Sequence, residues 1–333
     1  MVSLTDGQKA TLSPEAVEFI TNIHHIPFAQ TLAPFIASPR RVVTIAGLSV
    51  TVITPANIEP EKQNKLLFNV FGGATIMGSP RDRGALTMAA ELGVRVCSPD
   101  YTKAPEARYP VARDQCLAVY RELIQKGLPP LPSATSSSST SPPLVGPVDP
   151  ANMYAMGSSS GAQVLVSMLL VARREGLPLP TAGLYLCTPA LDLSGAGDSM
   201  TSNARDRDIM PVSLLTAMVT QNYVPLPGVE VDGKVFGGTT DPLYSPLYAD
   251  YTTKKDDGAA AAPWFPRTVM TVGTRDFALS NGVRFYWKLR EAGVEVELLV
   301  SEGMWHGFNW DPKVPEALTA RAAVVDFLER RTS

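Results

Sequence analysis

The pentapeptide G-S-S-S-G at residues 157–161 constrains the fold of this chain more than any other stretch. A short apolar run at 153–156 precedes it and a long apolar, helix-like segment follows it. The order strand, tight turn, helix is the context that a G-x-S-x-G nucleophile elbow requires, and both glycines let the backbone pass close to itself there. The pattern predicts that Ser159 presents its hydroxyl at a helix N-terminus. The N–H of Ser160 would lie beside it, where a developing negative charge is favoured.

Composition bounds the class of protein. The 333 residues are 45% hydrophobic and 18% charged, which is typical of a globular protein, and the net charge of −3 offers no basic surface for nucleic acid. No apolar run approaches the ~18 residues of a membrane-spanning helix, and the first residues do not resemble a signal peptide. We therefore expect a cytoplasmic protein without stable membrane insertion; a homodimer is left open. Cys97, Cys116 and Cys187 have no metal-ligand or redox spacing, so we expect buried thiols.

Apolar strands alternate with amphipathic helices over most of the chain. This alternation predicts an α/β fold with a mostly parallel central sheet and helices on both faces. The β-branched stretch 41–54 is interrupted by a glycine turn and predicts an antiparallel hairpin at the sheet edge. The strands expected after it are 65–71, 94–98, 153–156, 182–187, 267–273 and 294–301, and the helices are 85–92, a segment ending near 125, the segment after 161, 281–292 and 315–331.

Three segments interrupt this pattern. Residues 1–40 contain Phe28 and the pair His24-His25, and we expect them to form an N-terminal helical cap segment; adjacent histidines on a helix are poorly placed to share a metal. The proline- and serine-rich stretch 128–150 predicts a flexible insertion. Residues 194–250 predict a cap over the site. The core is then divided into 41–193 and 251–333.

Small residues follow the strand at 65–71. Gly72, Gly73 and Ala74 permit close backbone approach and leave N–H groups free to face a site. They are compatible with an oxyanion-hole loop and equally with a plain glycine turn.

Two further polar residues fall at the same sheet edge as Ser159. Asp276 comes three residues after the strand ending at Gly273, and His306 comes five residues after the strand ending at Ser301. Because the carboxyl ends of parallel strands meet at one edge, we expect the three side chains to converge. Their order along the chain, serine, aspartate, histidine, is that of α/β-hydrolases. Asp250, Asp256 and Asp257 are less suitable acids, since none directly follows a strand.

The chain resembles the hormone-sensitive-lipase-like carboxylesterases of the α/β-hydrolase fold from about residue 41 to its end. The blocks that carry the resemblance are FGGATIMGS (71–79), similar to the HGGG loop; DYTKAPEARYPVARDQCLAVY (100–120), similar to the DYRLAPE block; GSSSGA (157–162), similar to the GDSAGG elbow; GTRD (273–276) and GMWHGF (303–308), similar to the acid and histidine loops; and LDLS (191–194) and DPLYSPL (241–247).

The resemblance implies catalytic roles for these residues. Ser159 would be the nucleophile, His306 the base and then the acid, and Asp276 the group that orients the imidazole. The N–H groups of Gly72, Gly73 and Ser160 would hold the oxyanion, and neither a metal nor another cofactor is expected. The chain departs from the family pattern at four positions: Phe71 replaces histidine, Ser158 aspartate, Ala162 glycine, and Ser280 a second aspartate.

The expected reaction is cleavage of carboxylic esters with short-to-medium acyl chains through an acyl-enzyme. The substrate-binding candidates are apolar side chains of the loop and covers: Phe71, Ala74, Phe28, Met210, Leu214 and Trp305. An alternative is a specialised natural-product hydrolase acting on a lactone, a polyketide or a C–C bond, or in acyl transfer, which the altered oxyanion loop motivates. A second alternative is a non-catalytic small-molecule binding protein, since a fold alone does not fix function.

Overall fold

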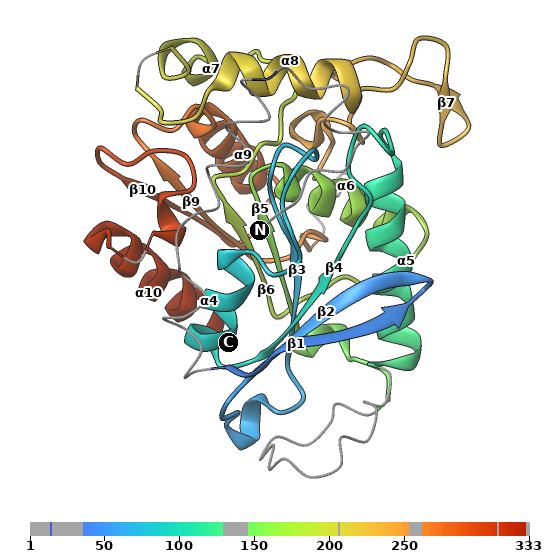
Figure 1. Ribbon diagram of the computed structural model, residues 1–333, viewed down its shortest axis with the longest axis vertical. Helices are drawn as coiled ribbons and strands as arrows, with labels where there is room; N and C mark the ends of the chain where they lie inside the picture. The colour runs from blue at the N-terminus through green and yellow to red at the C-terminus, as the bar shows by residue number, and fades with distance from the viewer. Residues whose placement is uncertain are drawn as a thin grey trace.

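The computed structural model describes residues 36–128, 146–205, 207–252, 262–311 and 313–330, together with Pro14. Eight strands form one sheet, in the order β1-β2-β4-β3-β5-β6-β9-β10 (Figure 1). They span β1 (Ile36–Ile45), β2 (Leu48–Pro55), β3 (Leu66–Val70), β4 (Arg95–Pro99), β5 (Met153–Ser158), β6 (Gly183–Cys187), β9 (Thr268–Gly273) and β10 (Val296–Ser301).

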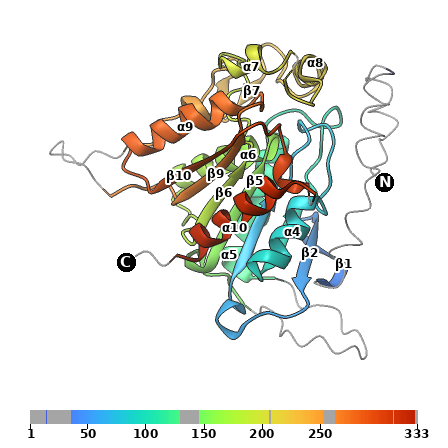
Figure 2. The same cartoon turned by 90° about the vertical axis from the view of Figure 1, so that its left-hand side faces the viewer.

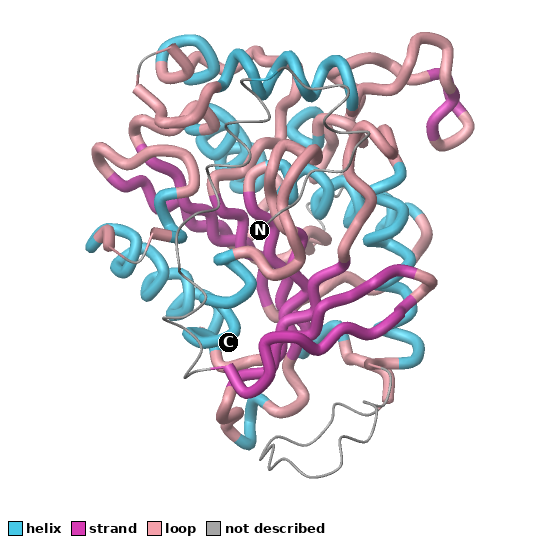
Figure 3. The backbone as a smooth tube through the Cα atoms, in the orientation of Figure 1, coloured by secondary structure: helices cyan, strands magenta, loops and turns pink. Residues whose placement is uncertain are grey.

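The sheet is parallel from β4 to β10. Only β2 runs against its two neighbours, pairing antiparallel with β1 and with β4. The sequence-based predictions of a mostly parallel sheet and of an antiparallel edge hairpin are therefore confirmed. In Figure 3 the strands form a continuous twisted layer through the middle of the molecule, with helices outside it.

Helices cover both faces of the sheet; Figure 2 looks toward one face, with helices in front of the strands. The helices are α4 (Arg83–Leu92), α5 (Val111–Lys126), α6 (Ser160–Arg174), α9 (Leu279–Glu291) and α10 (Pro315–Glu329). One apolar cluster joins the sheet to α5, α6 and α9, and a second joins the opposite face to α4 and α10. The 3-10 turns are η2 (Pro60–Lys62), η3 (Pro150–Asn152), η4 (Pro246–Tyr248) and η5 (Phe308–Trp310).

Burial on both faces explains why the central strands are continuous apolar runs. Every residue of β3, β5, β6 and β9 is buried, whereas β10, at the sheet edge, is only partly covered. Cys97, Cys116 and Cys187 are free and buried, as expected.

The N-terminal boundary differs from our expectation. Strand β1 begins at Ile36, so residues 36–40 belong to the sheet and not to a helical segment. The β-branched residues that follow extend the pairing with β2 back to this point. The rest of the expected N-terminal cap, with His24, His25 and Phe28, lies outside the described residues, as does most of the 128–150 insertion.

The segment 194–250 lies over the carboxyl ends of the parallel strands (Figures 1 and 2). It contains α7 (Ser199–Ser202), α8 (Val212–Asn222) and a small hairpin of β7 (Glu230–Val231) and β8 (Lys234–Val235). The hairpin turn is fastened to α5, because the buried guanidinium of Arg113 donates to both carboxylate oxygens of Asp232 at 2.7 Å. Within the described parts of the chain, no helix is long and apolar enough to cross a membrane.

Candidate active site

Ser159 occupies the turn between β5 and α6. Its backbone has φ 52° and ψ −122°, a conformation that L-residues rarely adopt. A Cβ at position 161 would lie 2.1 Å from the carbonyl oxygen of Val70, and one at position 157 would lie 2.6 Å from Cα of Ala162. Both positions therefore require glycine, for the reason that the sequence pattern indicated.

A continuous chain of hydrogen bonds joins Ser159, His306 and Asp276. The Nε2 atom of His306 lies 2.8 Å from the Oγ of Ser159, and its Nδ1 lies 2.8 Å from Oδ1 of Asp276. Asp276 is fully buried, and the same Oδ1 accepts the backbone N–H of Ala278 at 2.7 Å. The imidazole also stacks on the ring of Phe277, with centroids 4.3 Å apart. The three predicted residues, each following a different strand, thus converge at one sheet edge.

Electrostatics at this site favour a charged imidazole. Burial alone would lower the pKa of His306, but the adjacent Asp276 carboxylate, by charge and hydrogen bond, and the charge of Asp208 outweigh it. The pKa of His306 is therefore raised above its ordinary value of 6.5. An imidazolium formed during a reaction would be stabilised by the same two carboxylates.

The loop after β3 runs directly in front of Ser159. Gly73, Ala74 and Thr75 all have positive φ, and a Cβ at Gly72 would lie 2.6 Å from the carbonyl oxygen of Ser158. The backbone N–H groups of Gly72, Gly73 and Ser160 have no acceptor among the described residues. Free donors at this position can receive a negatively charged oxygen.

Phe71 does not contact the site in the way we expected. Its ring is fully buried, stacked on Tyr101 at 4.2 Å, and it is not among the residues that line the cavity. The prediction that Phe71 contacts substrate is therefore wrong: an apolar ring immediately after a central strand is drawn under the loop, into the core. The hydroxyl of Tyr101 donates to the Phe71 carbonyl at 2.9 Å and ties down the start of the loop.

The other departures from the family pattern have structural partners. Ser158 accepts a hydrogen bond from the indole N–H of Trp310 at 3.2 Å. Ser280 and Ser199 bond reciprocally, each hydroxyl accepting the backbone N–H of the other residue, at 2.8 and 3.0 Å. Ala162 is buried beneath the elbow.

A cavity of about 880 Å³ opens at Ser159 and His306, between the sheet edge and the cap. Ala74, Met210 and Trp305 line it, as expected, whereas Leu214 does not and Phe28 lies outside the described residues. Helix α8 instead presents one face to the cavity, with Val212, Leu215, Thr216, Val219 and Thr220 at helical spacing. The prediction for Leu214 is wrong because that residue lies off this face and packs beside the cap core.

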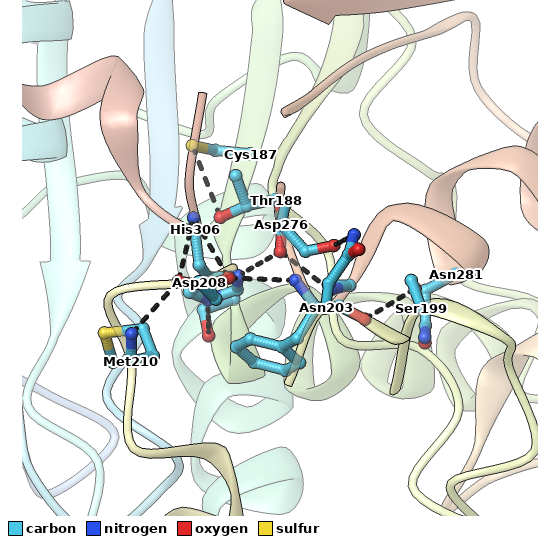
Figure 4. A network of polar contacts seen from close by, with 12 residues as sticks. Cys187, Thr188, Ser199, Asn203, Asp208, Met210, Asp276, Asn281 and His306 are labelled. Atoms are coloured by element: carbon cyan, nitrogen blue, oxygen red, sulfur yellow. Dashed lines mark hydrogen bonds and ion pairs between the residues drawn. The ribbon is translucent and has the colours of Figure 1, made fainter. Parts of the chain in front are cut away.

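The sequence did not reveal the cap residues that hold the acid loop. Figure 4 shows Ser199, Asn203 and Asp208 in one polar network with Asp276 and His306. The amide of Asn203 donates to the carbonyl oxygens of Thr274 and Asp276 at 3.1 and 2.9 Å. The Ser199 hydroxyl donates to the carbonyl of Phe277 at 2.7 Å. Ser199 begins the short helix α7, Asn203 follows its last residue and Asp208 lies between α7 and α8, with no periodicity or motif that could have identified them.

Asp208, Asp276 and His306 each bring one potential ligand atom within 4.8 Å of the others. Nδ1 of His306 and Oδ1 of Asp276 already bond to each other, and the Asp208 carboxylate accepts backbone N–H groups, so the cluster by itself does not indicate a cation site. That the reaction needs neither metal nor cofactor stays a prediction.

Comparison with known proteins agrees with this geometry. A family model described as alpha/beta hydrolase fold matches residues 67–309. An esterase of Acinetobacter venetianus is 28% identical over 269 residues, covering 79% of this chain and 74% of the relative. An acetyl-hydrolase of Streptomyces hygroscopicus is 26% identical over 297 residues, covering 88% and 84%.

Solved structures give the same result. The crystal structure of an esterase called E25 is 29% identical with a TM-score of 0.71, and the match covers 98% of this chain and 86% of that one. An esterase from the bacterial hormone-sensitive lipase family is 22% identical with a TM-score of 0.68, a likeness that concerns the fold; it covers 96% and 93%. This chain belongs to the α/β-hydrolase fold family, and the expectation of a hydrolase of the carboxylesterase type is confirmed.

Proposed function

We propose that the protein is a serine carboxylesterase that cleaves esters of short-to-medium acyl chain through Ser159, His306 and Asp276. The observation that carries this proposal is the pair of 2.8 Å hydrogen bonds on the two imidazole nitrogens, at a cavity beneath the cap. The relatives named esterase and acetyl-hydrolase support the same class of substrate.

In the first half-reaction, Oγ of Ser159 attacks the ester carbonyl carbon while Nε2 of His306 takes its proton. Asp276 holds the Nδ1–H and stabilises the imidazolium. The N–H groups of Gly72, Gly73 and Ser160 receive the oxyanion of the tetrahedral intermediate, where one such donor contributes about 3 kcal/mol. The imidazolium then protonates the oxygen of the leaving alcohol as its bond to the carbonyl carbon breaks. The acyl group stays on Oγ of Ser159.

In the second half-reaction, water enters the position that the alcohol has left. His306 takes a proton from this water, whose oxygen attacks the acyl carbonyl, and the same N–H groups hold the second oxyanion. Collapse of the intermediate returns the proton to Ser159 and releases the carboxylic acid. All the groups that these two half-reactions need lie at one edge of the sheet.

The cavity supports an apolar substrate of limited size. Its described walls combine Met210, Leu215 and Val219 from the cap with Trp305 beside the catalytic histidine. A volume of about 880 Å³ is within the usual range for small-molecule sites. We therefore expect acetate to octanoate esters to be cleaved more efficiently than palmitate esters.

The test is hydrolysis of p-nitrophenyl acetate, butyrate, octanoate and palmitate by the full chain and by Ser159→Ala. We expect activity that declines at the longest chain and falls at least 10⁴-fold in the variant. Absence of turnover by folded wild-type protein would contradict the esterase proposal. Labelling of Ser159 by a fluorophosphonate would then indicate a hydrolase of other substrates, such as lactones, while no labelling would favour a binding protein.

A further inference from the structure

Asp208 connects the cap to two catalytic loops at once. It lies between α7 and α8, and its Oδ2 accepts the backbone N–H of Phe277 at 2.8 Å, directly after Asp276. The backbone N–H of His306 points at the same carboxylate, 3.3 Å from Oδ2 and 3.4 Å from Oδ1. Oδ1 also accepts the N–H of Met210 at 3.1 Å, which turns the cap chain into the cavity wall. One half-buried side chain therefore bonds to the acid loop, the histidine loop and the cap.

Asp208 also places a second carboxylate beside the imidazole. One of its oxygens lies within 4.8 Å of both a ring nitrogen of His306 and a carboxylate oxygen of Asp276. Figure 4 shows Asp208 in the polar network of His306 and Asp276, to which Asn203 and Ser199 also belong. Those two neighbours are uncharged, so Asp208 alone among the cap residues labelled there adds a charge beside the imidazole.

We propose, on the basis of the esterase function above, that Asp208 is a positioning residue for catalysis. It fixes the loops that carry Asp276 and His306, and its negative charge stabilises the imidazolium that forms when Ser159 attacks. The cap then takes part in the catalytic machinery in addition to covering the substrate. Activity would depend on the cap being docked, because the second carboxylate withdraws whenever the cap leaves the loops.

The charges around His306 determine whether removal of the Asp208 carboxylate raises or lowers the pKa of His306. Among the described residues, the ionisable groups that act on the imidazole are the carboxylates of Asp276 and Asp208. Arg207 and Arg275 adjoin these aspartates in sequence, but neither contributes to the shift in the pKa of His306. The Arg275 guanidinium instead donates to the Arg207 carbonyl at 2.7 Å. Removing one of two negative charges disfavours the protonated imidazole and so lowers the pKa of His306.

The test compares Asp208→Asn with wild type, using kcat/KM for p-nitrophenyl butyrate against pH. The amide oxygen of asparagine can still accept the Phe277 N–H, but the amide nitrogen cannot accept the Met210 N–H, so the variant loses the charge and one hydrogen bond. We expect the midpoint of the acid limb, which reports the free enzyme's histidine, to fall by about half a pH unit to one unit. We expect kcat/KM on the alkaline plateau to fall about tenfold, because the imidazolium is less stabilised in the transition state. Asp208→Glu, which keeps the charge, should retain a midpoint close to wild type.

Two controls separate charge from structure. Asn203→Ala removes two hydrogen bonds to the same acid loop without changing charge, and it should lower activity with an unchanged midpoint. Asp198→Asn removes an exposed cap carboxylate that makes no capping hydrogen bond, and it should change neither the activity nor the midpoint. Equal midpoint shifts in Asn203→Ala or Asp198→Asn would overturn the proposal, as would a wild-type profile in Asp208→Asn.

A direct titration keeps this proposal separate from the esterase proposal. The chain has three histidines, so the imidazole signals of ¹⁵N-labelled protein can be followed by NMR and His306 assigned with His306→Gln. The pKa of His306 should fall in Asp208→Asn whether or not the protein cleaves the chosen esters. Should the asparagine variant not fold, Asp208→Ser removes the same charge and is titrated in the same way. An unchanged pKa in the folded charge-removing variant refutes the role of Asp208.

Discussion

The side-chain oxygen of Ser160 accepts a hydrogen bond from the backbone N–H of Thr75 at 3.0 Å. The bond joins the first residue of α6 to the loop that carries Gly72 and Gly73. Thr75 has a positive φ of 59°, and the loop bends back at this point. The residue that follows the candidate nucleophile therefore holds the neighbouring loop through its hydroxyl, while its own N–H remains available to the oxyanion.

We predict that Ser160→Ala lowers kcat for p-nitrophenyl butyrate about tenfold with little change in KM. The variant keeps all three oxyanion N–H groups but releases the loop that positions two of them, so the loss should be smaller than the 10²-fold or more that follows removal of a whole donor. Ser167→Ala is the matched control, since it removes a buried hydroxyl of the same helix that bonds to Leu243. Equal losses of kcat in both variants would contradict the anchoring role.

Gly161→Ala should prevent the elbow from forming. A Cβ there would lie 2.1 Å from the carbonyl oxygen of Val70 and 2.4 Å from that of Phe71, and neither strand-end carbonyl can move without breaking the sheet edge. We expect a loss in the free energy of unfolding of at least ~3 kcal/mol, measured by urea denaturation, or no folded protein. Gly176→Ala is the control: its Cβ would meet open space, so only the backbone cost of about 1 kcal/mol applies.

The sequence was most informative where one residue type must satisfy a local geometric demand. The glycines around Ser159 and the small residues after β3 identified the elbow and loop, because a tight approach excludes other side chains. Asp276 and His306 followed from topology, since parallel strands end at one edge and both residues lie just beyond a strand. Buried strands on both faces gave continuous apolar runs, which fixed the fold class.

Contacts between distant segments could not be predicted in the same way. Asp208 is one of two aspartates in the polar stretch 205–208, and its role arises only when the cap docks on the acid loop. The wall of the cavity depends on the rotation of α8 about its axis, which the sequence does not determine, so Leu214 is predicted to line the space whereas Val219 does so. The neighbours of Phe71 in sequence predict a place in the site, yet stacking on Tyr101 keeps its ring in the core.

Narrowing the cavity should change chain-length preference. Val219 lines the cavity from α8, so Val219→Trp should reduce kcat/KM for p-nitrophenyl octanoate at least tenfold relative to acetate. Acetate requires only the space next to Ser159 and should be cleaved at a similar rate. Ala217→Trp places the same ring on the exposed side of the helix and should leave the octanoate-to-acetate ratio unchanged. A ratio that Val219→Trp does not alter would place the acyl chain elsewhere.

Asp82 makes the stability of the protein depend on pH. Burial raises the pKa of its carboxyl from 3.8 to about 6, although the carboxylate accepts the Ala85 N–H at the start of α4. A carboxyl whose pKa is higher in the folded than in the unfolded chain favours folding at low pH, and that contribution disappears as pH rises through 6. One pKa unit corresponds to about 1.4 kcal/mol, so the full loss is at most ~3 kcal/mol.

We therefore predict that the stability of Asp82→Asn relative to wild type increases by up to ~3 kcal/mol between pH 4 and pH 8. Asparagine can still cap α4 with its side-chain oxygen, and it has no charge to bury. Urea denaturation of both proteins from pH 4 to 8 measures the difference. Asp149→Asn replaces an exposed cap at η3 that accepts the Ala151 N–H, and it should give no such pH-dependent gain. A constant difference between Asp82→Asn and wild type across this range would mean that the Asp82 carboxyl is not titrating there.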